Sequence, residues 1–148
     1  MRTHRFSFFL IALFLFFNTQ AQVTKVPPTA KENFAAQYPG ATQVEWYNEI
    51  LDVNVTFELD GKKMNAYYNN KGIWKQTLQD VAYDSLPAPV RDGFNKSKYV
   101  ERSVTEAKIV YFPGNIIQYR IKAEKNDWEK KYLFFNEKGR LLRENITL

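Results

Sequence analysis

Residues 51–61 read LDVNVTFELDG, and this stretch decides the fold. Apolar and polar side chains alternate along it, which is typical of a strand with one covered face and one wet face. Its apolar members are Leu51, Val53, Val55, Phe57 and Leu59. Asp60-Gly61 follows at once and favours a two-residue hairpin turn, because glycine accepts a positive φ without a Cβ clash. We therefore expect a strand at 51–59 and an antiparallel partner at 62–69.

The chain turns again at Asn70-Lys71-Gly72 and enters a further strand at 73–77. Within the returning strand, alternation assigns three side chains to the covered face and leaves Tyr67 on the other. The three are Met64, Ala66 and Tyr68. Short loops of this kind force neighbouring strands to be antiparallel, so we expect a meander.

The same plan occurs a second time along the chain. YYNNKG at 67–72 is echoed by FFNEKG at 134–139, an offset of 67, and the Pro-rich segment at 26–34 is matched at 86–94 with an offset of 60. One helix-plus-hairpins unit is therefore predicted to occur twice, at 22–80 and 81–148. The offset grows from 60 at the Pro-rich segment to 67 at the last turn, so the second unit has about seven extra residues, some of them in a turn at 113–115.

Each unit is predicted to begin with a helix. In the first, Thr29 and Glu32 fit a capping box, and Pro39-Gly40 ends the helix. In the second, which begins at Leu86-Pro87, Asp84 or Ser85 could cap the helix. The expected buried stripes are Ala30, Phe34 and Tyr38 in the first helix and Val90 and Phe94 in the second.

The second unit repeats the strand pattern of the first. We expect a turn at Asn126-Asp127 and a strand at 128–136, and the side chains of the preceding strand that face inward are Ile117, Tyr119, Ile121 and Ala123. The predicted fold class is α+β: a tandem repeat of a helix plus an antiparallel β-meander, in two layers, with the helices on one face of the sheet. The chain could be one domain or two small ones fused.

The N-terminus is predicted to be a signal for export. Basic residues precede an apolar run at 6–17, and Asn18-Thr19-Gln20-Ala21 offers a small-residue cleavage site after Ala21. The alternative is a retained membrane anchor, but twelve residues cover only about 18 Å of a hydrocarbon core of about 30 Å. The chain contains no cysteine, hence no lipobox, and we expect a periplasmic or secreted protein without stable membrane insertion after cleavage.

The composition argues against most site chemistries. The only histidine, His4, lies in the signal segment 1–21, and without histidine or cysteine the remaining chain excludes Ser-His-Asp or Cys-His catalysis and imidazole or thiolate zinc sites. It has no Walker-type loop, Rossmann glycine pattern or EF-hand loop, so we expect no cofactor. The formal charge of +5 is spread over interleaved lysines and glutamates, which disfavours nucleic-acid binding. We expect a protein that is not an enzyme.

Aromatic and basic side chains are the remaining candidates for a site. Alternation places Tyr67 and its equivalent, Phe134, together on the open sheet face, where exposed aromatic rings and cations favour protein binding. The candidate binding face consists of Tyr47, Tyr67, Arg120, Lys122, Trp128, Lys131, Tyr132 and Phe134. The alternative is that these rings only stabilise the strands by cross-strand pairing or lie under a loop.

The order of these motifs resembles a known family. Tyr38-Pro39-Gly40-Ala41 and Val44-Glu45-Trp46 precede the alternating strand, and Asn70–Trp74, Leu86-Pro87 and Lys138-Gly139 follow. This order resembles PepSY-like, β-lactamase-inhibitor-like secreted proteins of Bacteroidetes-type bacteria over essentially the whole mature chain. The resemblance implies a tandem fold similar to that of β-lactamase inhibitory protein. The chain departs from that inhibitor by lacking cysteines and a matching inhibitory loop, so no functional residue is carried over.

These observations predict an exported, non-enzymatic binding module that acts through the open sheet face. Its partner would be a protein or peptide in the envelope, and it could inhibit or modulate a peptidase or other envelope enzyme. An alternative is a periplasmic sensor domain for a small ligand, peptide or glycan, which needs a concave pocket of roughly a few hundred cubic ångströms. A third is a weak carboxylate hydrolase, which needs two acids about 5–10 Å apart in a cleft.

Overall fold

The computed structural model of the protein describes residues 25–147, so the predicted signal segment at 1–21 lies outside the described residues. The chain forms an α+β fold with one antiparallel sheet, whose eight strands follow one another in chain order. The elements are α1 Pro28–Gln37, β1 Thr42–Asn48, β2 Asp52–Leu59, β3 Lys62–Asn69, β4 Trp74–Val81, the 3₁₀ helix η1 Tyr83–Ser85, α2 Ala88–Asn95, β5 Ser103–Phe112, β6 Ile116–Glu124, β7 Lys130–Phe135 and β8 Leu141–Thr147. None of the helices within 25–147 is long and apolar enough to span a bilayer.

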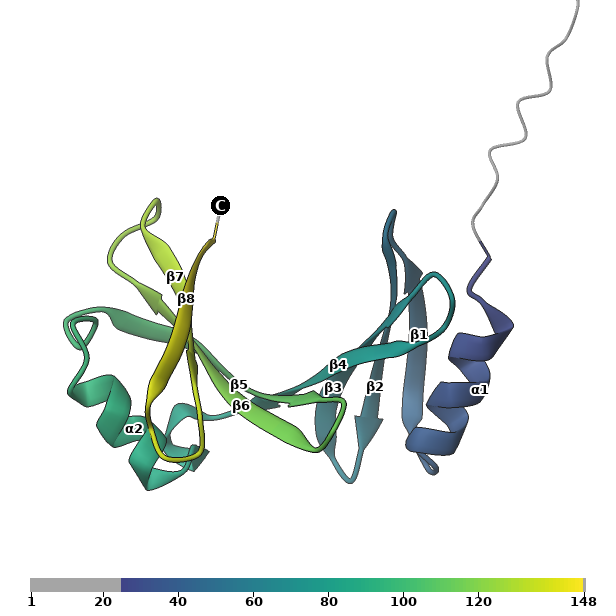
Figure 1. The fold of residues 1–148 in the computed structure, drawn as a ribbon, viewed down its shortest axis with the longest axis horizontal. Coiled ribbons are helices and arrows are strands. Elements are labelled where there is room, and N and C mark those ends of the chain that lie inside the picture. The colour runs from purple at the N-terminus through teal and green to yellow at the C-terminus, as the bar shows by residue number, and fades with distance from the viewer. Residues whose placement is uncertain (1–24, 148) are drawn as a thin grey trace, which may run out of the picture.

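The sheet bends into an arc that opens between β1 and β8 (Figure 1). Helix α1 lies beside the first four strands and α2 beside the last four. The β4 and β5 strands pair in register, so the sheet is continuous across the middle of the chain. The expected antiparallel meander is confirmed.

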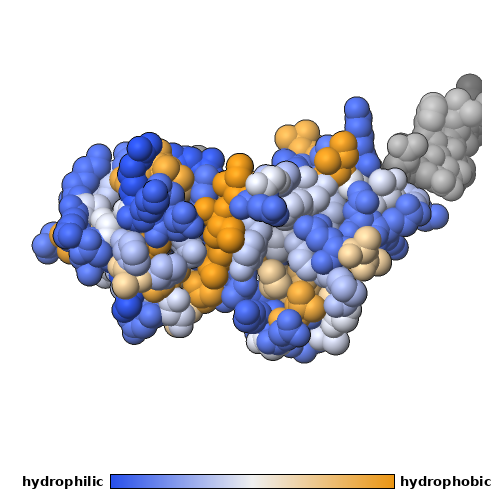
Figure 2. Space-filling view, turned by 60° about the horizontal axis from the view of Figure 1, so that its bottom comes forward, coloured by the Kyte–Doolittle hydropathy of each residue, from blue (hydrophilic) through white to orange (hydrophobic). Residues whose placement is uncertain are grey.

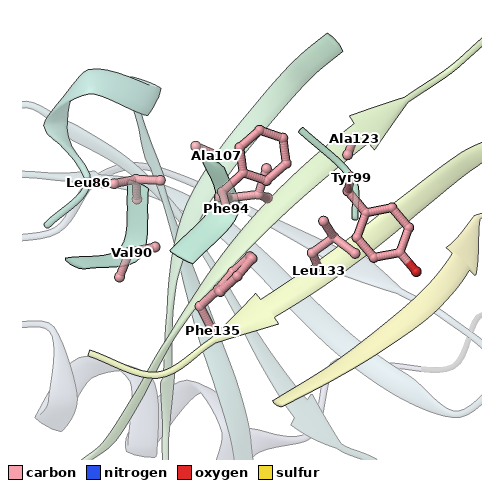
Figure 3. Close-up of a cluster of buried hydrophobic side chains, with 9 residues drawn as sticks. Leu86, Val90, Phe94, Tyr99, Ala107, Ala123, Leu133 and Phe135 are labelled. Carbon is pink, nitrogen blue, oxygen red and sulfur yellow. The ribbon is translucent and has the colours of Figure 1, made fainter. Parts of the chain in front are cut away.

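Each helix contributes to its own hydrophobic cluster. In the first, the Phe34 ring lies edge-on to Phe57 with centroids 4.9 Å apart and to Trp46 at 5.4 Å. In the second, Val90 and Phe94 of α2 project toward the buried side chains of β7 (Figure 3). That cluster consists of Leu86, Val90, Phe94, Tyr99, Ala107, Ile121, Ala123, Leu133 and Phe135. Since burying one large apolar side chain contributes about 1.5–3 kcal/mol, these clusters are the main source of stability.

One buried polar group joins strand to loop in the first cluster. Thr77 is fully buried, and its Oγ1 accepts a hydrogen bond from Trp74 Nε1 at 2.9 Å. The same oxygen lies 2.5 Å from the Tyr38 hydroxyl, with which it shares a second hydrogen bond. The Thr77 hydroxyl therefore satisfies two side chains that would otherwise lack a partner beneath the helix.

The turns β3–β4 and β7–β8 have the same hydrogen-bond pattern. In each, the side-chain oxygen of an asparagine accepts the N–H groups of the residues two and four positions later. The glycine three positions later donates its N–H to the carbonyl of that asparagine. The residues are Asn69 and Gly72 in the first turn and Asn136 and Gly139 in the second, and the two glycines have φ of +79° and +77°.

Both turns lie directly against a helix. A Cβ on Gly72 would lie 2.5 Å from the backbone nitrogen of Ala30, and a Cβ on Gly139 would lie 1.9 Å from the carbonyl oxygen of Pro89. On the helix side, the Asn33 Nδ2 group donates to the Gly72 carbonyl oxygen at 2.8 Å, whereas a Cβ on Gly93 would lie 2.0 Å from the Gly139 oxygen. Each helix is therefore positioned by a close backbone contact with a glycine turn.

The helix starts differ from the prediction. Neither helix has a side-chain cap, because prolines occupy both N-cap positions, Pro27 and Pro87. The expected capping box of Thr29 and Glu32 is wrong, since Thr29 is already inside the first helical turn. The expected cap from Asp84 or Ser85 is also wrong, because both residues belong to η1. Buried Ala30, Phe34, Val90 and Phe94 do form the predicted stripes.

Three expectations about the strands are also corrected. Leu51 is 77% exposed, because the chain turns just before β2 and the Glu49 N–H donates to the Asp52 carbonyl oxygen. Ile117 is 44% exposed at the start of β6. The last predicted strand, 128–136, is shorter, since β7 begins at Lys130.

The side of the arc that is lowest in Figure 1 carries apolar side chains in a band across its middle (Figure 2). Two more polar parts of the surface flank this band. The exposed apolar residues of the β5–β6 hairpin are Ile116 and Ile117. Exposed apolar groups of this kind are common on folded proteins, since more than half of a typical surface is apolar.

Candidate binding face

Strand register defines a sheet face that carries most of the candidate residues, and we call it the inner face. Successive strands pair Asn54 with Tyr67, Leu78 with Val110, and Arg120 with Phe134. Directly paired residues point to the same side, and the buried core positions alternate with them. The inner face lies on the side toward which the arc of the sheet opens (Figure 1).

A small hydrophobic cluster lies at the centre of the inner face. Three buried side chains form it, Leu78, Val110 and Phe134, and the partly buried side chains of Tyr67, Phe112 and Tyr132 pack against it. Phe134 is only 7% exposed, so the expectation that its ring is open to solvent is wrong. The bend of the sheet brings neighbouring inner-face side chains together, and the Arg143 guanidinium covers the Phe134 ring at 4.0 Å from its centroid.

Tyr67 belongs to this cluster but remains partly accessible. Burial raises the pKa of its hydroxyl above the ordinary value. Asn65 Nδ2 donates a hydrogen bond to that hydroxyl at 3.1 Å. At neutral pH Tyr67 therefore presents a neutral hydroxyl that can donate and accept hydrogen bonds.

The basic candidates on β6 form ordered contacts with their neighbours. Arg120 donates to a Glu106 carboxylate oxygen at 2.8 Å, and its guanidinium lies over the Tyr132 ring at 4.4 Å. Lys122 Nζ lies 2.9 Å from a carboxylate oxygen of Glu124, and this hydrogen bond raises the lysine pKa and lowers that of the carboxyl. The pairs hold both cations in defined positions on the inner face.

Lys131 does not belong to the inner face. It pairs with Ala123 and Ile146, which places its side chain on the opposite side from Tyr132. There its Nζ contacts a Glu144 carboxylate oxygen at 3.2 Å. The predicted grouping of Lys131 with the open face is therefore wrong.

Two aromatic candidates lie away from the central cluster. Trp128 is 93% exposed in the connection between β6 and β7, so it does not share the Tyr132 face as a strand residue would. Tyr47 lies on the edge strand β1, paired with Asn54, and is 46% exposed. Its hydroxyl donates to Glu45 at 2.6 Å, and this hydrogen bond raises the tyrosine pKa. The structure thus brings together Tyr67, Arg120, Lys122, Tyr132 and Phe134.

A hollow of about 310 Å³ lies beside the cluster, at the β1–β5 part of the inner face. Acidic residues and Asn65 contribute to its lining, and the buried Oδ1 atom of Asn65 has no hydrogen-bond partner among the described residues. The lining residues are Gln43, Glu45, Thr56, Phe57, Glu58, Lys63, Met64, Asn65, Asp80 and Lys108. None of residues 25–147 form a group of three or more His, Cys, Asp or Glu side chains that could hold a metal ion.

The hollow and the apolar centre of the face were not predicted from the sequence. The alternation that placed Tyr67 on the inner face also applies to Glu58 and Asn65, so it could have identified these two residues. Leu78 and Val110 are harder to assign from sequence. Leu78 lies between Gln76 and Asp80 on the inner-face side of β4, and Val110 follows Glu106 and Lys108 on that side of β5, so the alternation gives no reason for an apolar residue at either position.

Comparison with known proteins identifies relatives of this chain. A family model described as "Putative beta-lactamase-inhibitor-like, PepSY-like" matches residues 51–143, which confirms the resemblance predicted from the sequence. A BLIP-like protein from Bacteroides fragilis is 23% identical with a TM-score of 0.74, over 83% of this chain and 89% of that one. A DUF2874 family protein from Bacteroides ovatus is 29% identical with a TM-score of 0.74, over 82% and 89%.

A third solved structure, described as a putative periplasmic protein from Bacteroides eggerthii, is 22% identical with a TM-score of 0.72, over 82% of this chain and 89% of that one. No curated protein matches the chain. The solved structures show that the fold is shared, and at such identities they do not transfer a partner or an activity.

Proposed function

Since the chain belongs to the PepSY-like, β-lactamase-inhibitor-like family, we propose that it is an exported, non-enzymatic binding module that acts through its inner face. The partner is a protein or peptide of the envelope, and binding inhibits or modulates a peptidase or other envelope enzyme. The observation that carries this proposal is the apolar cluster of the inner face, whose buried centre supports the partly accessible rings of Tyr67, Phe112 and Tyr132. Apolar rings surrounded by charged side chains are the usual composition of a binding surface.

The proposal includes a duplicated architecture. The repeats are 22–80 and 81–148, each a helix with four strands, and both helices cover the outer face of the sheet. The matching hydrogen bonds of the Asn69 and Asn136 turns support the duplication. Register supports the shared face, since Ala66 of the α1 cluster lies in a row of directly paired residues that runs through Thr77 and Tyr111 to Ile117.

Export is proposed from the sequence of the N-terminal segment. Basic residues, a short apolar run and a small-residue site after Ala21 together have the pattern of a cleaved signal. The description of the Bacteroides eggerthii relative as periplasmic supports the same compartment for this chain. The proposed location is therefore the periplasm or the exterior.

Capture from envelope extract, followed by reconstitution with the purified partner, tests the inner face. Tyr67→Ala with Arg143→Ala changes the accessible part of the face and spares the buried Phe134, whose loss would damage the fold. The control is Trp128→Ala with Ile117→Ala, which removes exposed apolar groups outside the inner face. We expect the first variant to recover at least tenfold less partner than the wild type, and the control to recover the same amount. Equal recovery and equal inhibition with all forms would contradict the proposal.

The hollow beside the cluster favours a second candidate, a sensor domain for a small ligand, peptide or glycan. Its volume of about 310 Å³ lies at the lower end of the range for ligand sites. Thermal unfolding in the presence of short peptides and oligosaccharides tests this function. A ligand that raises the Tm of the wild type, but not of an Asn65→Leu variant, would favour the sensor function over the protein-binding one.

A further inference from the structure

We propose that the inner face recognises a protein segment of defined charge order: a basic side chain, preferably arginine, enters the hollow at the β1–β4 end, an apolar side chain rests on the central cluster, and an acidic side chain meets the β6–β8 end. This inference rests on the proposed function, since it names the chemistry of the partner at the same face. It follows from an unequal distribution of charge along the sheet.

The β1–β4 part of the inner face is acidic. Three acids, Glu45, Glu58 and Asp80, line the hollow. Two bases accompany them, Lys63 of β3 and Lys108 of the neighbouring β5, and Lys108 already pairs with Asp80. Among the described residues Glu45 and Glu58 form no ion pair. The Glu45 carboxylate accepts a hydrogen bond from the neutral Tyr47 hydroxyl, and the Glu58 carboxylate accepts one from the neutral side-chain amide of Gln43. Both carboxylates can therefore still pair with a cation from outside.

An unsatisfied acceptor adds to these carboxylates. The Oδ1 atom of Asn65 is buried and has no partner within the described residues, while its Nδ2 group is engaged with Tyr67. A buried oxygen without a hydrogen bond is unfavourable, so a donor that enters the hollow and reaches it as the Asn65 side chain adjusts is stabilised there. A guanidinium group has five N–H donors in a fixed plane and can reach an amide oxygen and a carboxylate at once.

The β6–β8 part of the inner face is basic. The acids in and next to this part are engaged within the chain, because Glu124 of β6 contacts Lys122, and Glu106 of the adjacent β5 contacts Lys108 and Arg120. Two cations, Lys130 and Arg143, have no ion pair among the described residues, and register places both on the inner face beside Thr147 and Phe134. An acidic group of a partner would meet these free cations.

The apolar cluster lies between the two charged parts. In β4 and β5, Leu78 pairs with Val110, while Asp80 pairs with Lys108 one pleat away, at 2.7 Å between the lysine nitrogen and a carboxylate oxygen. This ion pair marks the border at which the sign of the charge changes. A surface of uniform negative charge, such as a nucleic acid or an anionic lipid layer, would be repelled at the β1–β4 end, whereas a protein segment can match both ends.

Solution NMR of the isotope-labelled protein tests the charge order with small defined probes. The probes are N-acetyl-arginine amide, N-acetyl-citrulline amide as its neutral isostere, and N-acetyl-glutamate amide. We expect arginine to shift the side-chain amide of Asn65 and glutamate to shift the Nε–H signal of Arg143. The citrulline probe should bind the hollow at least about fivefold more weakly than the arginine probe, because it lacks the charge that pairs with the carboxylates at this partly exposed site.

A Glu45→Gln, Glu58→Gln variant should lose the arginine response by about fivefold and keep the glutamate response. The matched control, Glu101→Gln, changes an exposed carboxylate in the α2–β5 connection and should change neither. The proposal is overturned if no probe shifts these signals, if citrulline equals arginine, or if the two probes exchange ends. It is also overturned if sedimentation shows that the free protein self-associates through this face, since a second copy would then be its occupant.

Different results would contradict the charge order and the proposed function. If the envelope partner still depends on Tyr67 and Arg143 but the probes show no charge order, the proposed function stands and the charge order falls. If the probes follow the expected order but no envelope protein is captured through this face, the proposed function falls instead.

Discussion

Substitution of three glycines in the second half of the chain separates backbone strain from backbone contact. Two of them, Gly93 and Gly139, meet where α2 contacts the β7–β8 turn, and the third, Gly114, lies in the β5–β6 turn. Gly93 lies in α2 and needs no positive φ, but a Cβ there would lie 2.0 Å from the carbonyl oxygen of Gly139. Gly114 has φ of +79° and open space around it. Gly139 combines both constraints, with φ of +77° and a Cβ position 1.9 Å from the carbonyl oxygen of Pro89.

The magnitude for Gly93→Ala follows from two opposing terms. Helix propensity favours alanine over glycine by about 1 kcal/mol. Ordinary contact begins near 3.4 Å, so the helix and the turn must separate by more than an ångström, and neither backbone can rotate away as a side chain would. Overpacking of this kind costs about 3 kcal/mol at the upper end. The net expectation is a loss of about 2 kcal/mol, or a Tm lower by about 6–10 °C.

The other two substitutions calibrate this figure. Gly114→Ala meets strain alone and should cost about 1–2 kcal/mol. Gly139→Ala meets strain and contact and should cost about 4 kcal/mol, close to the whole stability of a marginal domain. Urea unfolding followed by circular dichroism, with an unchanged m-value, measures all three. A Gly93→Ala variant that is more stable than the wild type would refute the reasoning, because propensity would then outweigh the contact.

Three further outcomes are expected. Burial holds the pKa of Tyr68 well above the ordinary value of about 10, so the unfolded chain loses that proton before the folded chain does. The free energy of unfolding should therefore fall as the pH rises above about 10, and Tyr68→Phe should flatten this decline in urea unfolding at alkaline pH. Thr77→Val leaves the Trp74 indole without its acceptor and should cost about 2 kcal/mol in urea unfolding, and no loss would contradict the buried hydrogen bond. Leu133→Ala should cost about 2–5 kcal/mol, whereas Leu142→Ala at the exposed edge should change stability by about 0.5 kcal/mol or less, so similar values for both would argue against the second cluster.

The strand plan could be predicted because each signal is local. Alternation at 52–59, the Asp60-Gly61 turn and the two asparagine-glycine turns depend only on neighbouring residues, and all of them lie in the structure where the pattern indicates. The helix starts were harder to predict from the sequence. A polar residue before an apolar stripe favours a cap, but Pro27 and Pro87 occupy the N-cap positions and begin the helices without one.

For the candidate site, sequence determines the side of the sheet but not the exposure. Tyr67 and Phe134 do lie on the inner face, yet the bend of the sheet buries the Phe134 ring under Arg143, and no local pattern encodes that bend. Lys131 is a different case. It stands at an odd position with Leu133, and stricter use of the alternation would have excluded it from the face.

Strand order has a consequence for how the chain folds as it emerges. Every strand pairs with the next one along the chain, and even across the widest connection Thr77 pairs with Tyr111, only 34 positions later. Loop closure over such short separations costs little entropy, and proteins rich in local pairings fold quickly for their class. A chain delivered N-terminus first can therefore add strands one at a time. At each step the next strand pairs with the free edge of the strand added just before it.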